Sequence, residues 1–88
     1  MHRHDVYSVI DGERSYQEAK AVDPSRSDII SDLHVGDTIT AIRYNLDKAM
    51  EAWYSGSVPH KDAMEYLRKI AALCVQAGER YGMPDRKW

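Results

Sequence analysis

Residues 59–84 read PHKDAMEYLRKIAALCVQAGERYGMP, and this stretch decides the fold class because its apolar positions follow the period of a helix. Steps of four and three residues place six of them on one helical face: Ala63, Leu67, Ile70, Cys74, Ala77 and Tyr81. Neighbouring apolar residues widen this face to roughly 200°, whereas a helix that packs against one partner needs little more than about 100°. We therefore expect a helix that is covered from two sides, in a chain that self-associates. Gly82 and Pro84 predict where this helix ends.

The same spacing predicts a second helix from Val35 to Tyr54. Its apolar stripe consists of Val35, Ile39, Ile42, Leu46, Ala49 and Trp53. The connection from Ser55 to Pro59 is short and contains glycine and proline, so the second and third helices should be antiparallel neighbours. We expect Leu46 and Ile70 to be buried where these two helices meet.

A first helix is predicted from Val6 to Ala21, and it ends before Pro24 because a residue that precedes proline disfavours the helical conformation. The segment from Ser27 to Val35 is ambiguous, since its apolar residues allow a short helical turn but share no face with the helix that follows. Residues 1–5 and 83–88 are expected to be loose ends. The sequence therefore predicts one all-α domain over residues 1–88: three helices, an antiparallel hairpin of the second and third, and an oligomeric state.

Charge and composition exclude several classes of protein. The formal net charge is −2, which argues against a nonspecific nucleic-acid binder with a basic face. No apolar run approaches about 18 residues, so we expect no membrane span, and the first residues show no secretory leader. The single cysteine, Cys74, excludes a disulfide framework and favours a cytoplasmic protein. Because Cys74 lies on the apolar stripe of the third helix, we expect a packed, unreactive thiol.

Polar side chains on the first helix supply candidates for a ligand- or partner-binding site. Glu13 and Gln17 lie one turn apart, and Arg14 lies beside Glu13. A carboxylate, a guanidinium group and an amide in one place can bind a polar ligand through charge-assisted hydrogen bonds. The alternative is a solvated helix surface with an ion pair.

The other candidates are Arg43 and Asp47 on the second helix and Arg68 on the third, where guanidinium groups suit phosphate or a carboxylate. With Glu51, Arg43 and Asp47 form a ladder in which every fourth residue is charged. Carboxylates one turn apart can bind a divalent cation if a neighbouring helix adds oxygen ligands. Arg43 neutralises the ladder, however, and surface salt-bridge ladders are common. We therefore predict no metal site, no cofactor and no catalytic residue.

Three segments, taken in order, resemble a family of short, mostly uncharacterised proteins encoded by tailed bacteriophages. They are residues 10–17 (IDGERSYQ), residues 35–37 (VGD) with the apolar stripe that follows, and residues 67–73 (LRKIAAL). The resemblance implies a small factor, acting in the host cytoplasm, that antagonises or modulates a host or defence factor. It would do so by binding a host protein or by sequestering a nucleotide. An accessory structural phage protein is an alternative.

The motif formed by Glu13, Arg14 and Gln17 at the start of an all-helical chain is also similar to the MazG-type nucleoside triphosphate pyrophosphohydrolases. That resemblance implies Mg²⁺ held by a Glu-x-x-Glu pair on one helix and a Glu-x-x-Asp pair on the next. The acidic pairs present in this chain are Asp47 with Glu51 and Asp62 with Glu65. A divergent metal-dependent nucleotide hydrolase is therefore a further alternative.

Overall fold

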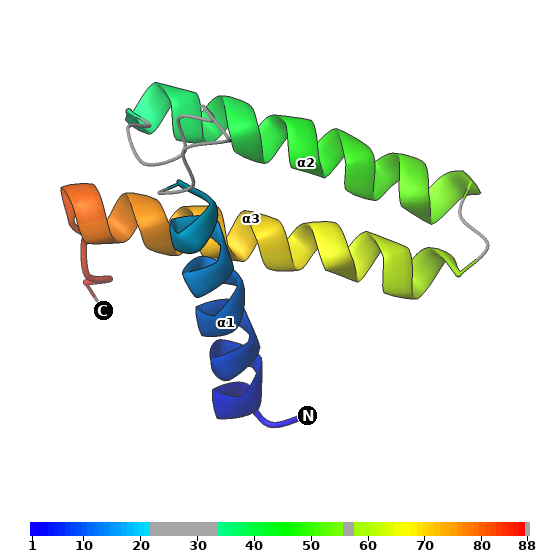
Figure 1. The fold of residues 1–88 in the computed structure, drawn as a ribbon, viewed down its shortest axis with the longest axis horizontal. Coiled ribbons are helices and arrows are strands. Elements are labelled where there is room, and N and C mark those ends of the chain that lie inside the picture. The colour runs from blue at the N-terminus through cyan, green and yellow to red at the C-terminus, as the bar shows by residue number, and fades with distance from the viewer. Residues whose placement is uncertain (22–33, 56–57, 88) are drawn as a thin grey trace.

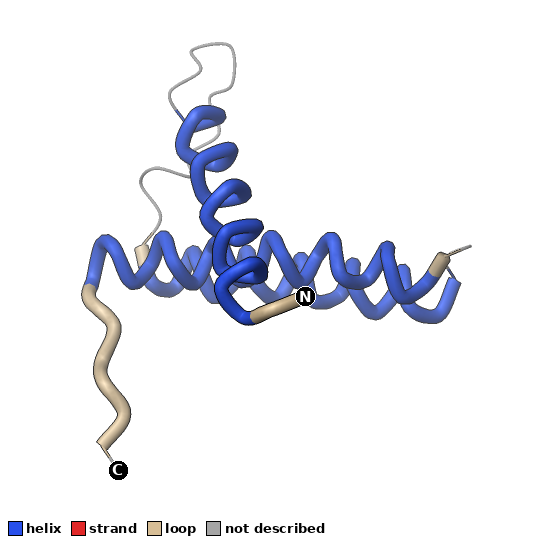
Figure 2. Tube along the Cα trace, turned by 90° about the horizontal axis from the view of Figure 1, so that it is seen from below, coloured by secondary structure: helices blue, strands red, loops and turns tan. Residues whose placement is uncertain are grey.

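The computed structural model describes residues 1–21, 34–55 and 58–87. Three helices make up most of this part of the chain: α1 (Arg3–Ala21), α2 (Val35–Ser55) and α3 (Pro59–Tyr81). The described residues contain no strand, so the prediction of an all-α, three-helix fold is confirmed. The helices α2 and α3 lie side by side and antiparallel, and α1 crosses α3 steeply (Figures 1 and 2). Within the described residues, α1 contacts α3 and does not contact α2.

Local hydrogen bonds lie where α1 and α2 begin. α1 begins at Arg3, before the predicted start at Val6, because the Asp5 carboxylate accepts a hydrogen bond from the His2 N–H at 3.2 Å. The Asp37 carboxylate accepts the His34 N–H in the same way, also at 3.2 Å, where α2 begins. α3 ends at Tyr81, before Gly82, as the sequence predicts. The ambiguous segment that begins at Ser27 lies, up to residue 33, outside the described residues.

Small and polar side chains, rather than large apolar ones, fill the space between the helices. The buried residues are Thr38 and Ala49 on α2, Ala72, Leu73 and Gln76 on α3, and Gln17 on α1. Short side chains allow helix axes to approach closely, which explains how α2 and α3 pack along their length. Leu73 is the one large apolar side chain in the buried set of the described residues.

Two predictions about the interior are wrong. Leu46 is 46% exposed and the thiol of Cys74 is exposed, whereas Ile70 is half-buried. The reason is that α2 turns its small and polar side, with Thr38 and Ala49, toward α3. Ala49 belongs to the predicted stripe and is buried, but larger members of the stripe, such as Ile39 and Leu46, lie to one side of the contact.

The molecule is more expanded than a self-contained domain of this length. Its radius of gyration is 14.1 Å, whereas about 12 Å is expected for a compact chain of 88 residues. No large side chain among the described residues is fully buried. The three helices therefore form a shallow interior and leave much apolar surface exposed.

Candidate functional site

An ion pair between Glu13 and Arg68 joins the middle of α1 to the middle of α3. The Arg68 Nε donates a hydrogen bond to the Glu13 Oε1 at 2.8 Å. The Glu13 side chain is only 9% exposed, so its carboxylate is largely withdrawn from water. A partly buried carboxylate needs such a partner, since an uncompensated charge there is costly. The structure thus brings two of the predicted site residues together as an interhelical contact.

The other two candidates on α1 also face α3. The Arg14 Nε donates to the Glu79 Oε1 at 2.8 Å, and the Arg14 Nη2 reaches the Glu79 Oε2 at 3.4 Å. Gln17 is buried, and its Nε2 donates a long hydrogen bond of 3.4 Å to the Lys69 carbonyl. Among the described residues, the Gln17 Oε1 has no hydrogen-bond partner. Glu13, Arg14 and Gln17 therefore fasten α1 to α3 in this conformation, and a role in ligand binding stays a prediction.

The candidates on α2 lie elsewhere. Arg43 and Asp47 are exposed, and α1 does not contact the helix that carries them. Within the described residues no ion pair joins Arg43 to Asp47; Glu51 pairs instead with Lys48 at 3.4 Å. The hydrogen bond from Lys48 to the Glu51 carboxylate raises the pKa of the Lys48 ammonium group. The six predicted residues therefore do not border one common groove.

The acidic pairs suggested by the hydrolase resemblance lie on two different helices. Asp47 and Glu51 lie on α2, and Asp62 and Glu65 lie on the first half of α3. In the part of the chain that the structure describes, no three His, Cys, Asp or Glu residues are placed to hold one metal ion.

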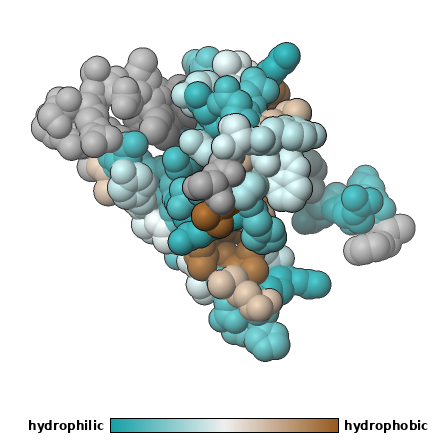
Figure 3. All heavy atoms as spheres, turned by 90° about the vertical axis from the view of Figure 1, so that its right-hand side faces the viewer, coloured by the Kyte–Doolittle hydropathy of each residue, from teal (hydrophilic) through white to brown (hydrophobic). Residues whose placement is uncertain are grey.

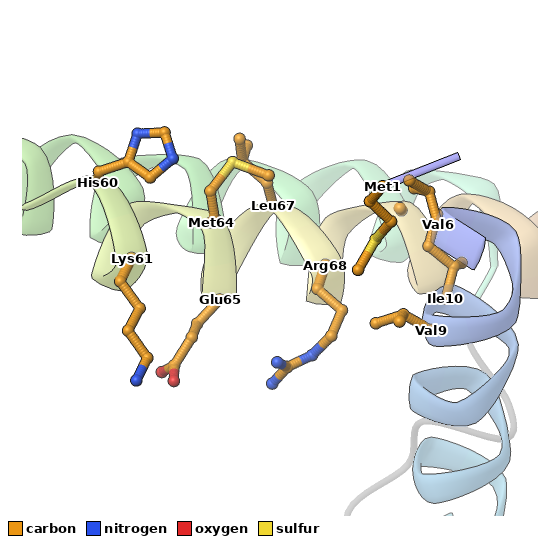
Figure 4. A pocket seen from close by; sticks show the side chains of 11 residues that line it. Met1, Val6, Val9, Ile10, His60, Lys61, Met64, Glu65, Leu67 and Arg68 are labelled. Atoms are coloured by element: carbon orange, nitrogen blue, oxygen red, sulfur yellow. The ribbon is translucent and has the colours of Figure 1, made fainter. Parts of the chain in front are cut away.

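The structure adds a groove that the sequence did not predict, where α1 crosses α3 (Figure 4). Its volume is about 580 Å³. The apolar part of its lining consists of Met1, Val6, Val9 and Ile10 from the α1 side and Met64, Leu67 and Ala71 from α3. Figure 3, which looks toward the end of the hairpin where α3 begins, shows strongly apolar side chains gathered in the lower half of the view.

Charged groups border the groove along one side. Figure 4 shows the ends of the Lys61, Glu65 and Arg68 side chains in a row along α3, on the side toward which α1 extends. The floor is apolar and the edge carries both signs of charge, so the groove suits an apolar segment flanked by polar groups. The sequence did contain a signal for each wall of the groove taken alone. On α3, for example, Met64, Leu67 and Ala71 recur at steps of three and four and therefore share one face of the helix.

Comparison of the chain with protein-family models, with curated proteins and with solved structures finds no match in any of the three. The resemblances to phage proteins and to MazG-type enzymes, both based on short motifs, accordingly stay predictions. Among the described helices, none combines the length and the apolar character that crossing a membrane requires. The geometry where α1 crosses α3 is thus the best basis for a functional proposal.

Proposed function

We propose that this chain is a small, non-catalytic binding protein that works as a homo-oligomer and takes an apolar segment of a partner protein into the α1–α3 groove. The groove itself carries this proposal, because an apolar concavity with a few polar groups at its edge is the usual form of a binding site. Its volume of about 580 Å³ is comparable to that of a small-molecule pocket, so it has room for a few side chains of a partner segment.

A helical segment of the partner fits the chemistry of the groove best. Val6, Val9 and Ile10 on one wall and Met64 and Leu67 on the other present apolar side chains at helical intervals. An amphipathic helix docks in such a groove through side chains spaced three or four residues apart. Methionine side chains adapt to irregular apolar surfaces, which suits Met64 to contact with a flexible or variable ligand.

A nucleotide fits the same groove less well. Its phosphates need uncommitted cations, and the Arg68 guanidinium group already donates to the Glu13 carboxylate at 2.8 Å. Lys61 has the acidic Glu65 beside it along the groove edge. Of the two ligand classes that the sequence suggests, a protein segment is therefore the one that we propose.

The kind of partner, a host or defence protein that a phage-type factor antagonises or modulates in the host cytoplasm, is proposed from the sequence resemblance alone. The accessory structural phage protein and the divergent nucleotide hydrolase remain as alternatives to it. They differ in what they require of the chain: the first needs no ligand in the groove, and the second needs metal-dependent turnover at its acidic pairs.

Nuclear magnetic resonance with a panel of synthetic amphipathic helical peptides tests the proposal. We expect the side-chain signals of Val6, Val9, Met64 and Leu67 to shift when a peptide binds. Val9→Asp should weaken that binding at least about tenfold, because a carboxylate in an apolar groove is left unpaired. Tyr7→Asp is the matched control, since Tyr7 is also exposed on α1 and does not line the groove.

Three results would overturn the proposal. If no peptide shifts these signals, or if both aspartate variants bind equally well, the groove is not the binding site. If the chain instead releases pyrophosphate from nucleoside triphosphates with Mg²⁺, and Glu51→Gln abolishes that reaction, the hydrolase alternative replaces binding.

A further inference from the structure

A second apolar surface lies on the α2–α3 hairpin, apart from most of the groove. On α2 it consists of Val35, Ile39, Leu46, Met50 and Trp53, and on α3 of Leu67, Cys74 and Tyr81; we call this set the hairpin face. Ile39 is 62% exposed and Met50 is 53% exposed, so these side chains have little cover within one chain. Leu67 borders both the hairpin face and the groove.

The two halves of the hairpin face lie on the same side of the hairpin. At about 100° per residue, the α2 stripe is roughly a quarter-turn away from the buried residues Thr38 and Ala49. The α3 stripe is roughly a quarter-turn away from the buried Leu73, in the same rotational sense. Because the helices are antiparallel, equal rotations in the same sense bring both stripes out on one side of the pair.

α1 covers the opposite side. Its contacts with α3 involve Arg68, Lys69 and Glu79. Measured around α3 from the buried Leu73, these residues lie in one rotational sense and Cys74 lies in the other. Figure 2 shows α1 rising above the overlapping α2 and α3, while the C-terminal segment leaves α3 below them. α1 thus packs on one side of α3 alone, since it does not contact α2. No described part of the chain covers the other side of the hairpin except at its end, where Met83 lies against Gly78.

We infer that the hairpin face binds a second copy of this chain, so that two hairpins form a four-helix bundle. This inference rests on the proposed homo-oligomer and assigns the surface that forms it. Apolar stripes with steps of three, four and seven residues along two antiparallel helices are half of such a bundle, in which apolar side chains of facing helices interdigitate. In Figure 2, residues 82–87 leave α3 on the side of the hairpin away from α1.

The exposed area fits a second copy. The hairpin face presents seven large apolar side chains that are each about half exposed, which amounts to on the order of 700 Å². A stable interface of standard size buries about 800 Å² on each partner. One copy therefore offers almost the whole area that a stable two-fold contact needs.

Charge also allows the face to meet its own copy. The hairpin face contains no charged residue, so two copies bring no like charges together at its centre. At the outer edge of α2, Arg43 and Asp47 offer one cation and one anion, and neither is in an ion pair within the described residues. A two-fold arrangement can place opposite charges of the two copies near each other at this edge.

Sedimentation equilibrium of the full chain from about 1 to 500 µM, a range that covers dissociation constants on the order of micromolar and above, tests the inference first. We expect the apparent mass to rise from that of one 10.1 kDa chain to twice that value. A monomer throughout the range, or a trimer or larger assembly, overturns the bundle.

Point variants then test the surface. Ile39→Glu and Met50→Glu should each weaken dimerisation about a hundredfold or more, because each buries an unpaired carboxylate in the contact. Both residues are more than half exposed in one chain, so helical content should not change. Tyr44→Glu is the matched control, since Tyr44 is equally exposed on the other side of α2. A dimer that survives both hairpin variants, or that Val9→Glu in the groove abolishes, overturns the assignment.

The single cysteine supplies a measurement that needs no substitution. If the hairpin face is the contact, alkylation of Cys74 in the native chain should slow at least about tenfold between the monomeric and dimeric concentrations, because its thiol becomes covered. An unchanged rate overturns the inference. Peptide binding to the groove in the monomeric Ile39→Glu variant separates this inference from the proposed function, since either one can fail alone.

Discussion

Single side chains hold α1 in place, and the pair of Glu13 and Arg68 is the most consequential of them. Arg68→Met removes the cation and leaves a carboxylate that is 9% exposed without a partner. We expect the contact of α1 with α3 to lose about 1–3 kcal/mol, since that is the usual cost of an unsatisfied buried group. Hydrogen exchange should then be faster in the amides of α1 while those of α2 and α3 change little.

Arg43→Met is the control for this prediction, because it removes an exposed guanidinium group that is in no ion pair within the described residues. It should leave exchange in α1 unchanged. Equal exchange in the two variants would show that the ion pair contributes nothing to the position of α1, as happens for many exposed pairs.

Gln17 presents the opposite case, a buried polar side chain whose removal should stabilise the protein. Its Oε1 has no partner among the described residues, and its Nε2 makes only a long bond of 3.4 Å. Gln17→Met keeps the length of the side chain and removes the cost of the buried amide, so we expect a gain of about 1 kcal/mol. Thermal unfolding should shift upward by about 4–8 °C, whereas Glu18→Met, on the exposed side of α1, should have little effect.

Among the helices as elements, two glycines should respond to alanine in opposite directions. A Cβ at Gly12 meets nothing within 4 Å, so Gly12→Ala should stabilise α1 by about 0.5–1 kcal/mol through helix propensity. Gly82 has φ +82° and ψ 154°, a conformation that is essentially restricted to glycine. Gly82→Ala should therefore cost about 1–3 kcal/mol. Denaturant unfolding of both variants checks the signs, and a shared sign would contradict the described end of α3.

The packing of α2 on α3 makes a separate prediction about two leucines. Leu73 is 5% exposed, so Leu73→Ala should cost about 2–5 kcal/mol of unfolding free energy. Leu46→Ala should cost roughly half as much or less at concentrations where the chain is monomeric, since Leu46 is already half exposed. Urea unfolding at low micromolar concentration measures both, and equal losses would mean that α2 is rotated from its described position.

Periodicity was enough to predict α2 and α3 almost to the residue, because helical spacing and end signals are local properties of the chain. It could not show which side of α2 meets α3. A stripe with Leu46 on it marks the most apolar side of a helix, but the sequence does not say whether the same chain or another molecule covers that side. The prediction that Leu46 and Cys74 are buried failed for this reason.

The candidate site shows a similar limit. Spacing identified Glu13, Arg14 and Gln17 as neighbours on α1, which is correct. Their partners Arg68 and Glu79 lie 55 and 65 residues away along the chain, and no local pattern reveals such contacts. The groove between α1 and α3 depends on the same long-range arrangement, so its two walls were visible in the sequence only as separate apolar segments.

For the molecule as a whole, the shallow interior leads us to expect that stability depends on association. Since no large side chain among the described residues is fully buried, one chain alone should be marginally stable. If two copies bury the hairpin face, folding and association are linked, and unfolding becomes harder at higher protein concentration. A hundredfold rise in concentration is worth about 2.7 kcal/mol for each dimer, or about half of that for each chain.

Thermal unfolding at 5 and 500 µM should therefore differ by about 5–10 °C in the native chain, given the usual sensitivity of small domains. The Ile39→Glu variant should unfold at one temperature at both concentrations, close to the lower value of the native chain, because its single-chain interior is unchanged. Tyr44→Glu should keep the concentration dependence, since Tyr44 lies away from the hairpin face. A native chain whose unfolding temperature does not move with concentration would mean that the three helices are stable alone, and that their exposed apolar surface is not needed for folding.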